Sequence, residues 1–128
     1  MPQLKERTAK IKAPARPAPK SELRELADRY LAWQVAMRYT ESTVKGSGYD
    51  LAWLLRYLEE QGIDRVADVT AETLTDYSLC LRKQRNTRHE DRKISLAHVM
   101  HRLFGVKQFF RWLMEQMIIL INPAEDLE

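Results

Sequence analysis

The 128 residues are 45% apolar and 30% charged, which is enough apolar material for the core of one ordinary globular domain. The single cysteine excludes an intramolecular disulfide framework, so we expect a reducing, cytoplasmic compartment. The longest apolar run, residues 117–121, is far shorter than the roughly 18 residues that a membrane span requires, which argues against a membrane protein.

The net charge of +3 is unevenly distributed along the chain. Residues 1–20 carry a net charge of +5 and four of the five prolines, without a helical apolar period, and predict a disordered basic tail. Residues 21–81 carry a net charge of −5, whereas residues 82–111 carry +7. A basic block between acidic segments indicates either a surface that faces a polyanion or a solvated loop.

Apolar residues at helical spacing predict two helices in the first half of the chain. The first covers residues 21–39, with Ser21 as its N-cap. The second follows a cap at Thr40 or Ser42 and is predicted to end at Gly62.

Two glycines, Gly46 and Gly48, weaken the first half of the second helix, since each costs about 1 kcal/mol relative to Ala. They indicate either a close approach of the backbone to a partner or a frayed helix start. A third helix is predicted from Thr70 to about Arg85, followed by a polar connector over residues 86–93.

The longest helix is predicted to begin at Ile94 or Ser95 and to reach about Leu120, where Asn122 and Pro123 would end it. At about 100° per residue it has two faces. One face is apolar and is expected in the core: Val99, Leu103, Val106, Phe110, Leu113, Met117 and Ile121. The other is polar and is a candidate binding surface: His98, His101, Arg102, Gly105 and Gln108. No segment alternates as a strand would, so the predicted fold class is all-α.

Two groups of short segments stand out for their order and spacing. The first group is residues 41–45 (ESTVK), 49–51 (YDL) and 70–74 (TAETL). The second is residues 98–113 (HVMHRLFGVKQFFRWL) and 122–127 (NPAEDL). Together they resemble the N-terminal core-binding domain of tyrosine recombinases, also called phage integrases. The resemblance implies a SAM-like bundle of four or five helices over residues 21–122, with residues 123–128 beginning a linker to a catalytic domain.

The resemblance also implies a function. In this family the bundle forms half of a clamp around duplex DNA at the recombination core site, with the catalytic domain and sister subunits as further partners and no cofactor. The implied contacts from the second helix are Thr43, Lys45, Ser47 and Tyr49. Those from the connector and the long helix are Arg92, Lys93, Ser95, His98, His101, Arg102 and Lys107. Many members carry an aromatic residue followed by basic ones where this chain has residues 47–49, so the second helix departs from the family pattern.

The polar face of the long helix has the chemistry for DNA contacts. Arg102 can bridge a phosphate or fork onto a guanine edge, and His98 and His101 can donate to phosphate or base acceptors. Gly105 would let the helix lie close to its partner. We therefore expect Arg102 to be exposed, with mere solvation of the helix as the alternative. Lys107 lies nearer the apolar face, where its stem can pass over apolar neighbours.

Catalysis by this chain alone is not expected. The segment from His89 to Arg92 matches the His-x-x-Arg box of the tyrosine recombinases literally, but it lies in the polar connector. The family nucleophile is a tyrosine downstream of that box, whereas every tyrosine here precedes His89. His98 and His101 lack further ligands for a metal, and Cys80 is expected to be a buried apolar residue.

Two other classes of protein remain open. A helical protein–protein interaction module would fit if the basic residues were scattered over the surface. A helix-turn-helix regulator needs a tight turn between two helices, and the connector over residues 86–93 is too long for one. The apolar run over residues 117–121 is expected in the core, or as a patch for another domain or subunit.

Overall fold

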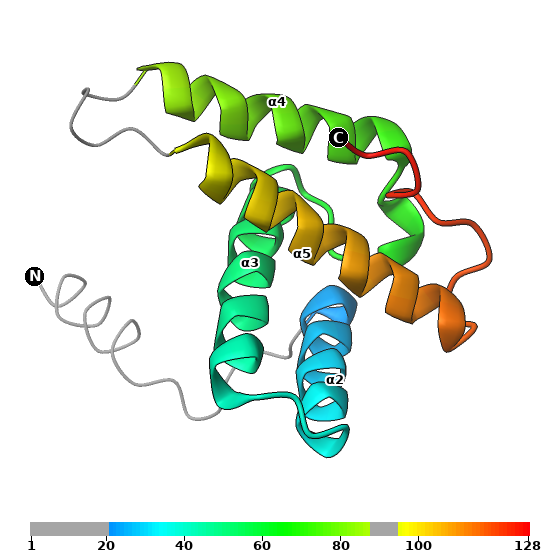
Figure 1. The fold of residues 1–128 in the computed structure, drawn as a ribbon. Helices are drawn as coiled ribbons and strands as arrows, with labels where there is room; N and C mark the ends of the chain where they lie inside the picture. Colours follow the sequence, from blue (N-terminus) through cyan, green and yellow to red (C-terminus); the bar gives the residue numbers. More distant parts are fainter. Residues whose placement is uncertain (1–20, 88–94) are drawn as a thin grey trace, which may run out of the picture.

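The computed structural model describes residues 21–87 and 95–128, which contain four α-helices and one short 3-10 helix. Along the chain they are α2 (Glu22–Ala36), α3 (Glu41–Glu60), η1 (Val66–Asp68), α4 (Ala71–Thr87) and α5 (Leu96–Glu115) (Figure 1). These ranges contain no strand, so the all-α prediction is confirmed. None of their helices is long and apolar enough to cross a membrane. The predicted tail over residues 1–20 and most of the predicted connector lie outside the described residues.

The helices begin where the sequence predicts, because the predicted capping side chains are in place. Each accepts a hydrogen bond from the backbone N–H three residues ahead, at 3.1–3.2 Å, and so satisfies one of the helix's unpaired donors. These caps are Ser21, Thr40, Thr70 and Ser95. The α3 helix continues without a break through Gly46 and Gly48, so its start is not frayed.

Three helices end in a residue with left-handed backbone conformation, at Arg38 (φ 68°), Gly62 (φ 78°) and Met117 (φ 59°). After each, the next N–H bonds to a carbonyl five residues back, at 2.9–3.0 Å, which is the Schellman motif. Only in α3 is the left-handed residue a glycine, the residue type that predicts such a helix end. The ends predicted near Tyr39 and Leu120 are wrong for this reason: α2 ends at Ala36 and α5 at Glu115.

The ending of α5 leads to a stability prediction. Because the left-handed region is unfavourable for a residue with a Cβ, replacing Met117 with Gly should raise the free energy of unfolding by about 0.5–1 kcal/mol. The matched control is Met114→Gly within α5, which should lower it by about 1 kcal/mol. Urea denaturation of the two variants checks both signs, and a loss of stability in Met117→Gly would contradict the strain assigned to this cap.

The early end of α5 also corrects the expected core. Met117 and Ile121, predicted to be buried, are 77% and 83% exposed, because the chain leaves the helical path before it reaches them. The segment that follows instead returns to the bundle. Its Ala124 and Leu127 are buried, and the Ser78 hydroxyl donates a hydrogen bond to the Glu128 carbonyl at 2.9 Å. The packed domain therefore extends past the boundary expected at residue 122.

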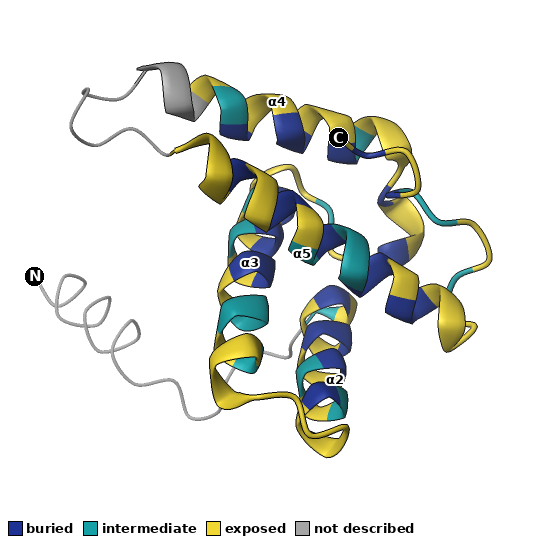
Figure 2. Ribbon diagram, viewed as in Figure 1, coloured by how far each residue is buried: buried dark blue, intermediate teal, exposed yellow. Residues whose placement is uncertain are grey.

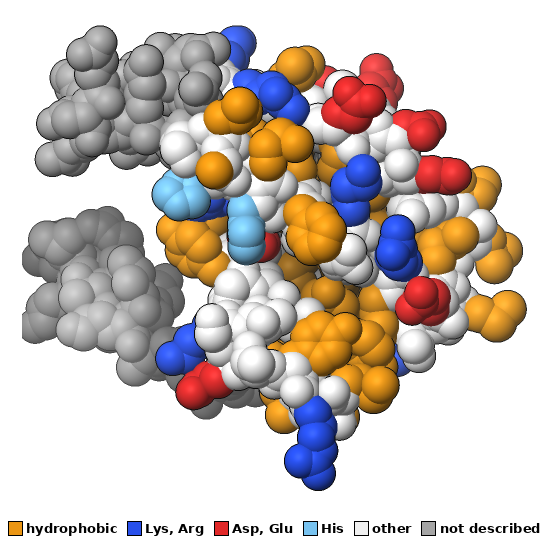
Figure 3. Space-filling view, viewed as in Figure 1, with side chains coloured by type: hydrophobic (Ala, Val, Ile, Leu, Met, Phe, Trp, Pro, Cys, Tyr) orange, Lys and Arg blue, Asp and Glu red, His pale blue; other side chains and the backbone are white. Residues whose placement is uncertain are grey.

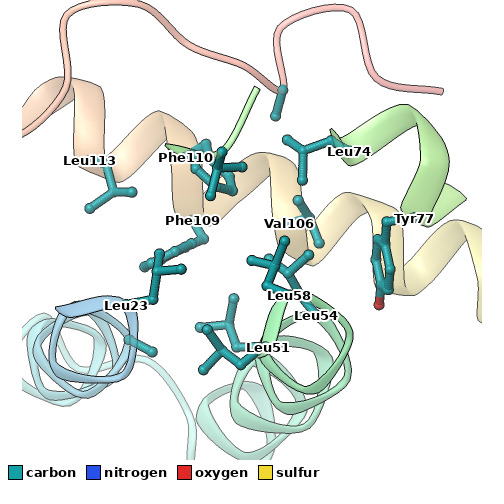
Figure 4. Close-up of a cluster of buried hydrophobic side chains, with 14 of the residues drawn as sticks. Leu23, Leu51, Leu54, Leu58, Leu74, Tyr77, Val106, Phe109, Phe110 and Leu113 are labelled. Atoms are coloured by element: carbon teal, nitrogen blue, oxygen red, sulfur yellow. The ribbon is translucent and has the colours of Figure 1, made fainter. Parts of the chain in front are cut away.

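The four helices enclose one core. The α2 and α3 helices form an antiparallel pair, α5 crosses both of them, and α4 lies along α5 (Figure 1). In each helix the buried residues line the inner side (Figure 2). Leucines from α2, α3 and α4 meet the apolar face of α5 in the centre (Figure 4). Five of the seven predicted core residues of α5 are buried: Val99, Leu103, Val106, Phe110 and Leu113. Cys80, expected to be buried, is exposed and lines a hollow between α3 and α4.

Candidate nucleic-acid interface

The candidate site is built on a very close crossing of α3 and α5. At the crossing, Gly105 of α5 faces Asp50 of α3. A Cβ atom at position 105 would lie 2.6 Å from the Asp50 Oδ2 atom and 2.8 Å from its Cβ atom, which is too close for real atoms. Gly105 was expected to allow close approach to DNA. The structure shows that it allows the close approach of α5 to α3.

A cleft of about 460 Å³ opens beside this crossing, between α2, α3 and α5. Thr43 and Ser47 line it from α3, while His101 and Gln108 line it from α5. These residues come from the two segments to which the resemblance assigns DNA contacts, and they are more than fifty positions apart in the sequence. On this face the pale blue histidine side chains border hydrophobic side chains as well as white surface, which consists of other side chains and backbone (Figure 3). The fold thus brings Thr43, Ser47 and His101, three of the eleven predicted contacts, to one surface.

A buried carboxylate holds the histidine at the rim of the cleft. Asp50 is only 4% exposed, and its Oδ2 atom lies 3.1 Å from the Nδ1 atom of His101, whose side chain is largely exposed. Burial raises the pKa of Asp50 above its ordinary value, and the nearby His101 and Arg102 oppose this shift only in part. With Nδ1 turned toward Asp50, the His101 ring presents Nε2 to the solvent. That nitrogen is a hydrogen-bonding group for a ligand at the rim of the cleft.

The raised pKa of Asp50 has a consequence for stability. At pH values above the ordinary pKa of an aspartate, the unfolded chain has released the proton of Asp50 while the folded chain still binds it. The fold therefore loses stability as the pH rises and Asp50 ionises. We expect Asp50→Asn, which keeps the shape and can still accept a hydrogen bond from His101, to gain stability relative to the native chain between pH 4 and pH 7. Urea denaturation across that range measures this difference. A difference that is constant with pH, or that falls, would contradict the assignment.

Arg102 is not exposed, and the expectation that it reaches into solvent is wrong. Its side chain is 7% exposed, and the guanidinium carbon lies 4.5 Å from the centre of the Trp53 ring and 5.1 Å from that of Tyr49. One nitrogen donates a hydrogen bond to the His98 carbonyl at 3.4 Å, while Nε has no partner. Position 102 of α5 faces α3, where the rings of Trp53 and Tyr49 cover the arginine side chain. A helical wheel of α5 alone places this side chain on the polar face.

The other predicted contacts have varied surroundings. Thr43 and His98 are exposed, and Lys45 is exposed beside Glu41, with its Nζ 3.9 Å from the carboxylate. The Ser47 hydroxyl is half-buried and accepts a hydrogen bond from the Gln34 amide at 3.0 Å. The Ser95 hydroxyl caps α5, and Lys107 is half-buried, as its place near the apolar face predicts. Arg92 and Lys93 lie outside the described residues.

Some residues of the cleft were not found by sequence reasoning. Phe104 lines the cleft, and 59% of its surface is exposed. Its apolar residue type does not predict an exposed position one turn beyond His101. Gln34 and Asp50 are buried polar residues, and their burial depends on how α2, α3 and α5 pack together. Periodicity within a single helix contains no such information.

The charge of the described segments differs from that of the whole chain. Residues 21–87 and 95–128 contain twelve Lys and Arg against fifteen Asp and Glu. The surplus of positive charge therefore belongs to residues 1–20 and 88–94. Electrostatic attraction between the described bundle and a polyanion depends on where its cations lie, since its net charge is negative.

Comparison of the chain with protein-family models, with curated proteins and with solved structures gave no match. Within the described ranges, no three His, Cys, Asp or Glu residues lie close enough together to hold a metal ion.

Proposed function

We propose that this chain is a DNA-binding domain of the core-binding type, which grips duplex DNA at the core site of a tyrosine recombinase. The observation that carries the proposal is that Thr43 and Ser47 of α3 and His101 of α5 line the same cleft. The family resemblance assigned these residues to DNA from two separate stretches of sequence.

The chemistry of this surface suits the grooves and phosphates of a duplex. The hydroxyl of Thr43, the amide of Gln108 and the ring of His101 offer donors and acceptors to base edges or phosphate oxygens. The exposed ring of Phe104 offers an apolar contact of the kind that a thymine methyl group makes. Buried Arg102 would act by supporting this surface and not by reading a base.

The proposal extends to partners and compartment. The domain would act in the cytoplasm together with a catalytic domain and with sister subunits bound to the same DNA. The chain alone would bind DNA without cleaving it, because no tyrosine follows the His89 to Arg92 segment in this sequence.

Binding to duplex DNA that weakens steeply with salt is the first expected result. If the full chain neutralises about five phosphates, the slope of log affinity against log salt should be about −4 to −5, because each phosphate contributes about −0.9. Fluorescence anisotropy of a labelled duplex between about 50 and 200 mM salt measures this slope. Absence of binding at the low end, or affinity indifferent to salt, would contradict the proposal.

The location of the interface is tested with matched variants. His101→Ala and Gln108→Ala should each weaken duplex binding severalfold, since both side chains line the cleft. Arg65→Ala serves as the control, because Arg65 is an exposed cation that precedes η1, beyond the far end of α3. If the control loses as much affinity as the cleft variants, the DNA contacts lie outside the cleft.

A protein-interaction module is the second candidate function, and one observation favours it. A groove of about 550 Å³ runs between η1, the start of α4 and residues 118–123, where Leu120 and Ile121 are largely exposed. The helix-turn-helix alternative has less support. Four residues join α2 to α3, but Arg24 pairs with Glu59 and the two helices run antiparallel, whereas that motif requires a crossing of roughly 90–120°.

A further inference from the structure

A second surface of α3 combines aromatic rings with cations and is separate from the cleft. Tyr49, Trp53, Arg56 and Tyr57 recur at helical spacing on α3, on the side away from its buried leucines. We call these four residues the aromatic–arginine stripe. Only Tyr49 was among the predicted contacts, and none of the four lines the 460 Å³ cleft.

The rings of the stripe are held in place, with Tyr49 exposed and with Trp53 and Tyr57 half-buried against the core. Tyr49 is 59% exposed, and its ring meets that of Trp53 nearly edge to face at a centroid distance of 6.5 Å. The buried Arg102 guanidinium lies against both rings and fixes them from the α5 side. Tyr57 instead packs against the ring of Tyr77 of α4, at a centroid distance of 5.2 Å. The stripe is therefore a preformed surface.

Hollows lie on both sides of Trp53 and Arg56. One, of about 390 Å³, extends toward Arg24 of α2, and the other, of about 340 Å³, extends toward Tyr77 and Cys80 of α4. Both volumes lie at the lower end of the range of about 300–1,000 Å³ that is typical of ligand sites. Both hollows have an aromatic wall and the guanidinium of Arg56, and the second is also lined by Glu60, so the hollow toward Arg24 suits a planar group with a negatively charged neighbour better.

The two arginines differ in how far their charge is neutralised. Arg24 is forked onto Glu59, with its Nη2 atom 3.0 Å from Oε1. Arg56 is exposed, and no hydrogen bond or ion pair joins it to any of the described residues. Its guanidinium is free to meet a phosphate beside the rings.

We propose that the aromatic–arginine stripe binds single-stranded nucleic acid, with bases stacked on Trp53 and Tyr49 and a backbone phosphate on Arg56. Exposed aromatic rings beside cations are the usual way in which proteins hold unpaired bases, because every base has a π-face. In a duplex the faces of the bases are hidden within the stack. The stripe would therefore bind unpaired strands, whereas the cleft would bind duplex DNA. The inference does not depend on the proposed binding of duplex DNA.

The test uses the full chain and an oligo(dT) of about ten nucleotides. Cys80, the only cysteine, is exposed in the hollow beside Trp53 and Arg56 and reports occupancy of this place. We expect oligo(dT) to quench tryptophan fluorescence and to slow alkylation of Cys80. Alkylation that is unchanged at saturating oligo(dT) would overturn the proposal.

Variants separate this surface from the cleft. Tyr49→Leu and Arg56→Glu change exposed side chains and should each weaken oligo(dT) binding at least about fivefold, which is the lower end of the effect of losing one stacked base. Arg56→Glu, at a position outside the predicted duplex contacts and the cleft, should not change duplex binding as much as His101→Ala does. Conversely, His101→Ala should leave oligo(dT) binding unchanged. Circular dichroism of each variant confirms that the helices remain.

Other results would refute the inference in distinguishable ways. Duplex binding at the cleft with no affinity for oligo(dT) would overturn the stripe proposal and leave the duplex proposal standing. Protection of Cys80 by a proline-rich peptide and not by oligo(dT) would assign the stripe to a protein partner, since aromatic grooves also receive such peptides. Oligo(dT) binding that survives both Tyr49→Leu and Arg56→Glu would place the strand elsewhere.

Discussion

Replacement of Gly105 with Ala should lower the free energy of unfolding by about 1–3 kcal/mol, the usual penalty for an added group in a tightly packed place. A Cβ there would meet the backbone-proximal Cβ of Asp50 at 2.8 Å, so rotation of the carboxylate alone cannot make room. The helices α3 and α5 would have to move apart, which would also change the cleft. Urea denaturation measures the loss, and duplex binding should weaken in parallel.

Two controls isolate the cause of this loss. Gly46→Ala adds the same methyl group inside α3, where nothing lies within 4 Å, and should gain up to about 1 kcal/mol from helix propensity. The double variant Asp50→Ala with Gly105→Ala should not recover the native stability, because the Cβ of residue 50 is still present. Recovery in the double variant would mean that the carboxylate, and not the approach of the helices, is the obstacle.

The local features of this fold were predictable because they depend on neighbours in the sequence. A hydroxyl ahead of an apolar period fixes each helix start, since it pairs with an N–H three residues on. The buried faces follow from the 3.6-residue period, as the central positions of α5 from Val99 to Leu113 illustrate. The resemblance, in turn, named Thr43 and His101 from segments that the fold brings to one cleft.

The features that were missed depend on tertiary contacts or on rare backbone conformations. Met117 ends α5 in a left-handed conformation that is typical of glycine, so the residue type gave no warning. Asp50 and Arg102 are buried because α5 passes so near α3, and a helical wheel treats each helix as if it were isolated. Charged residues are buried only with partners, and the partners of Arg102 lie about fifty positions away in the sequence.

Arg102 links the two proposed surfaces. Its guanidinium lies against the rings of Tyr49 and Trp53 in the stripe, and its charge acts on Asp50, which orients His101 in the cleft. A change at this position should therefore disturb both surfaces through the packing of α3 against α5. It should not act as the loss of a single contact to DNA.

Replacement of Arg102 with Ala should lower the free energy of unfolding by about 2 kcal/mol or more. A desolvated cation on an aromatic face contributes about 2 kcal/mol, and the long stem contributes packing as well. Arg102→Met separates the two contributions, because it keeps most of the stem and removes the charge. We expect Arg102→Met to be less stable than the native chain and more stable than Arg102→Ala, as measured by urea denaturation.

The pH dependence of this loss tests the link to Asp50. The charge of Arg102 lowers the pKa of Asp50 against the larger effect of burial, so its removal raises that pKa further. Between pH 4 and pH 7 the unfolded chain then ionises Asp50 more readily than the folded chain does, and the fold loses additional stability. Both Arg102 variants should therefore be more destabilised at pH 7 than at pH 4. A loss below about 0.5 kcal/mol at both values would make Arg102 an ordinary surface residue and remove the support assigned to both sites.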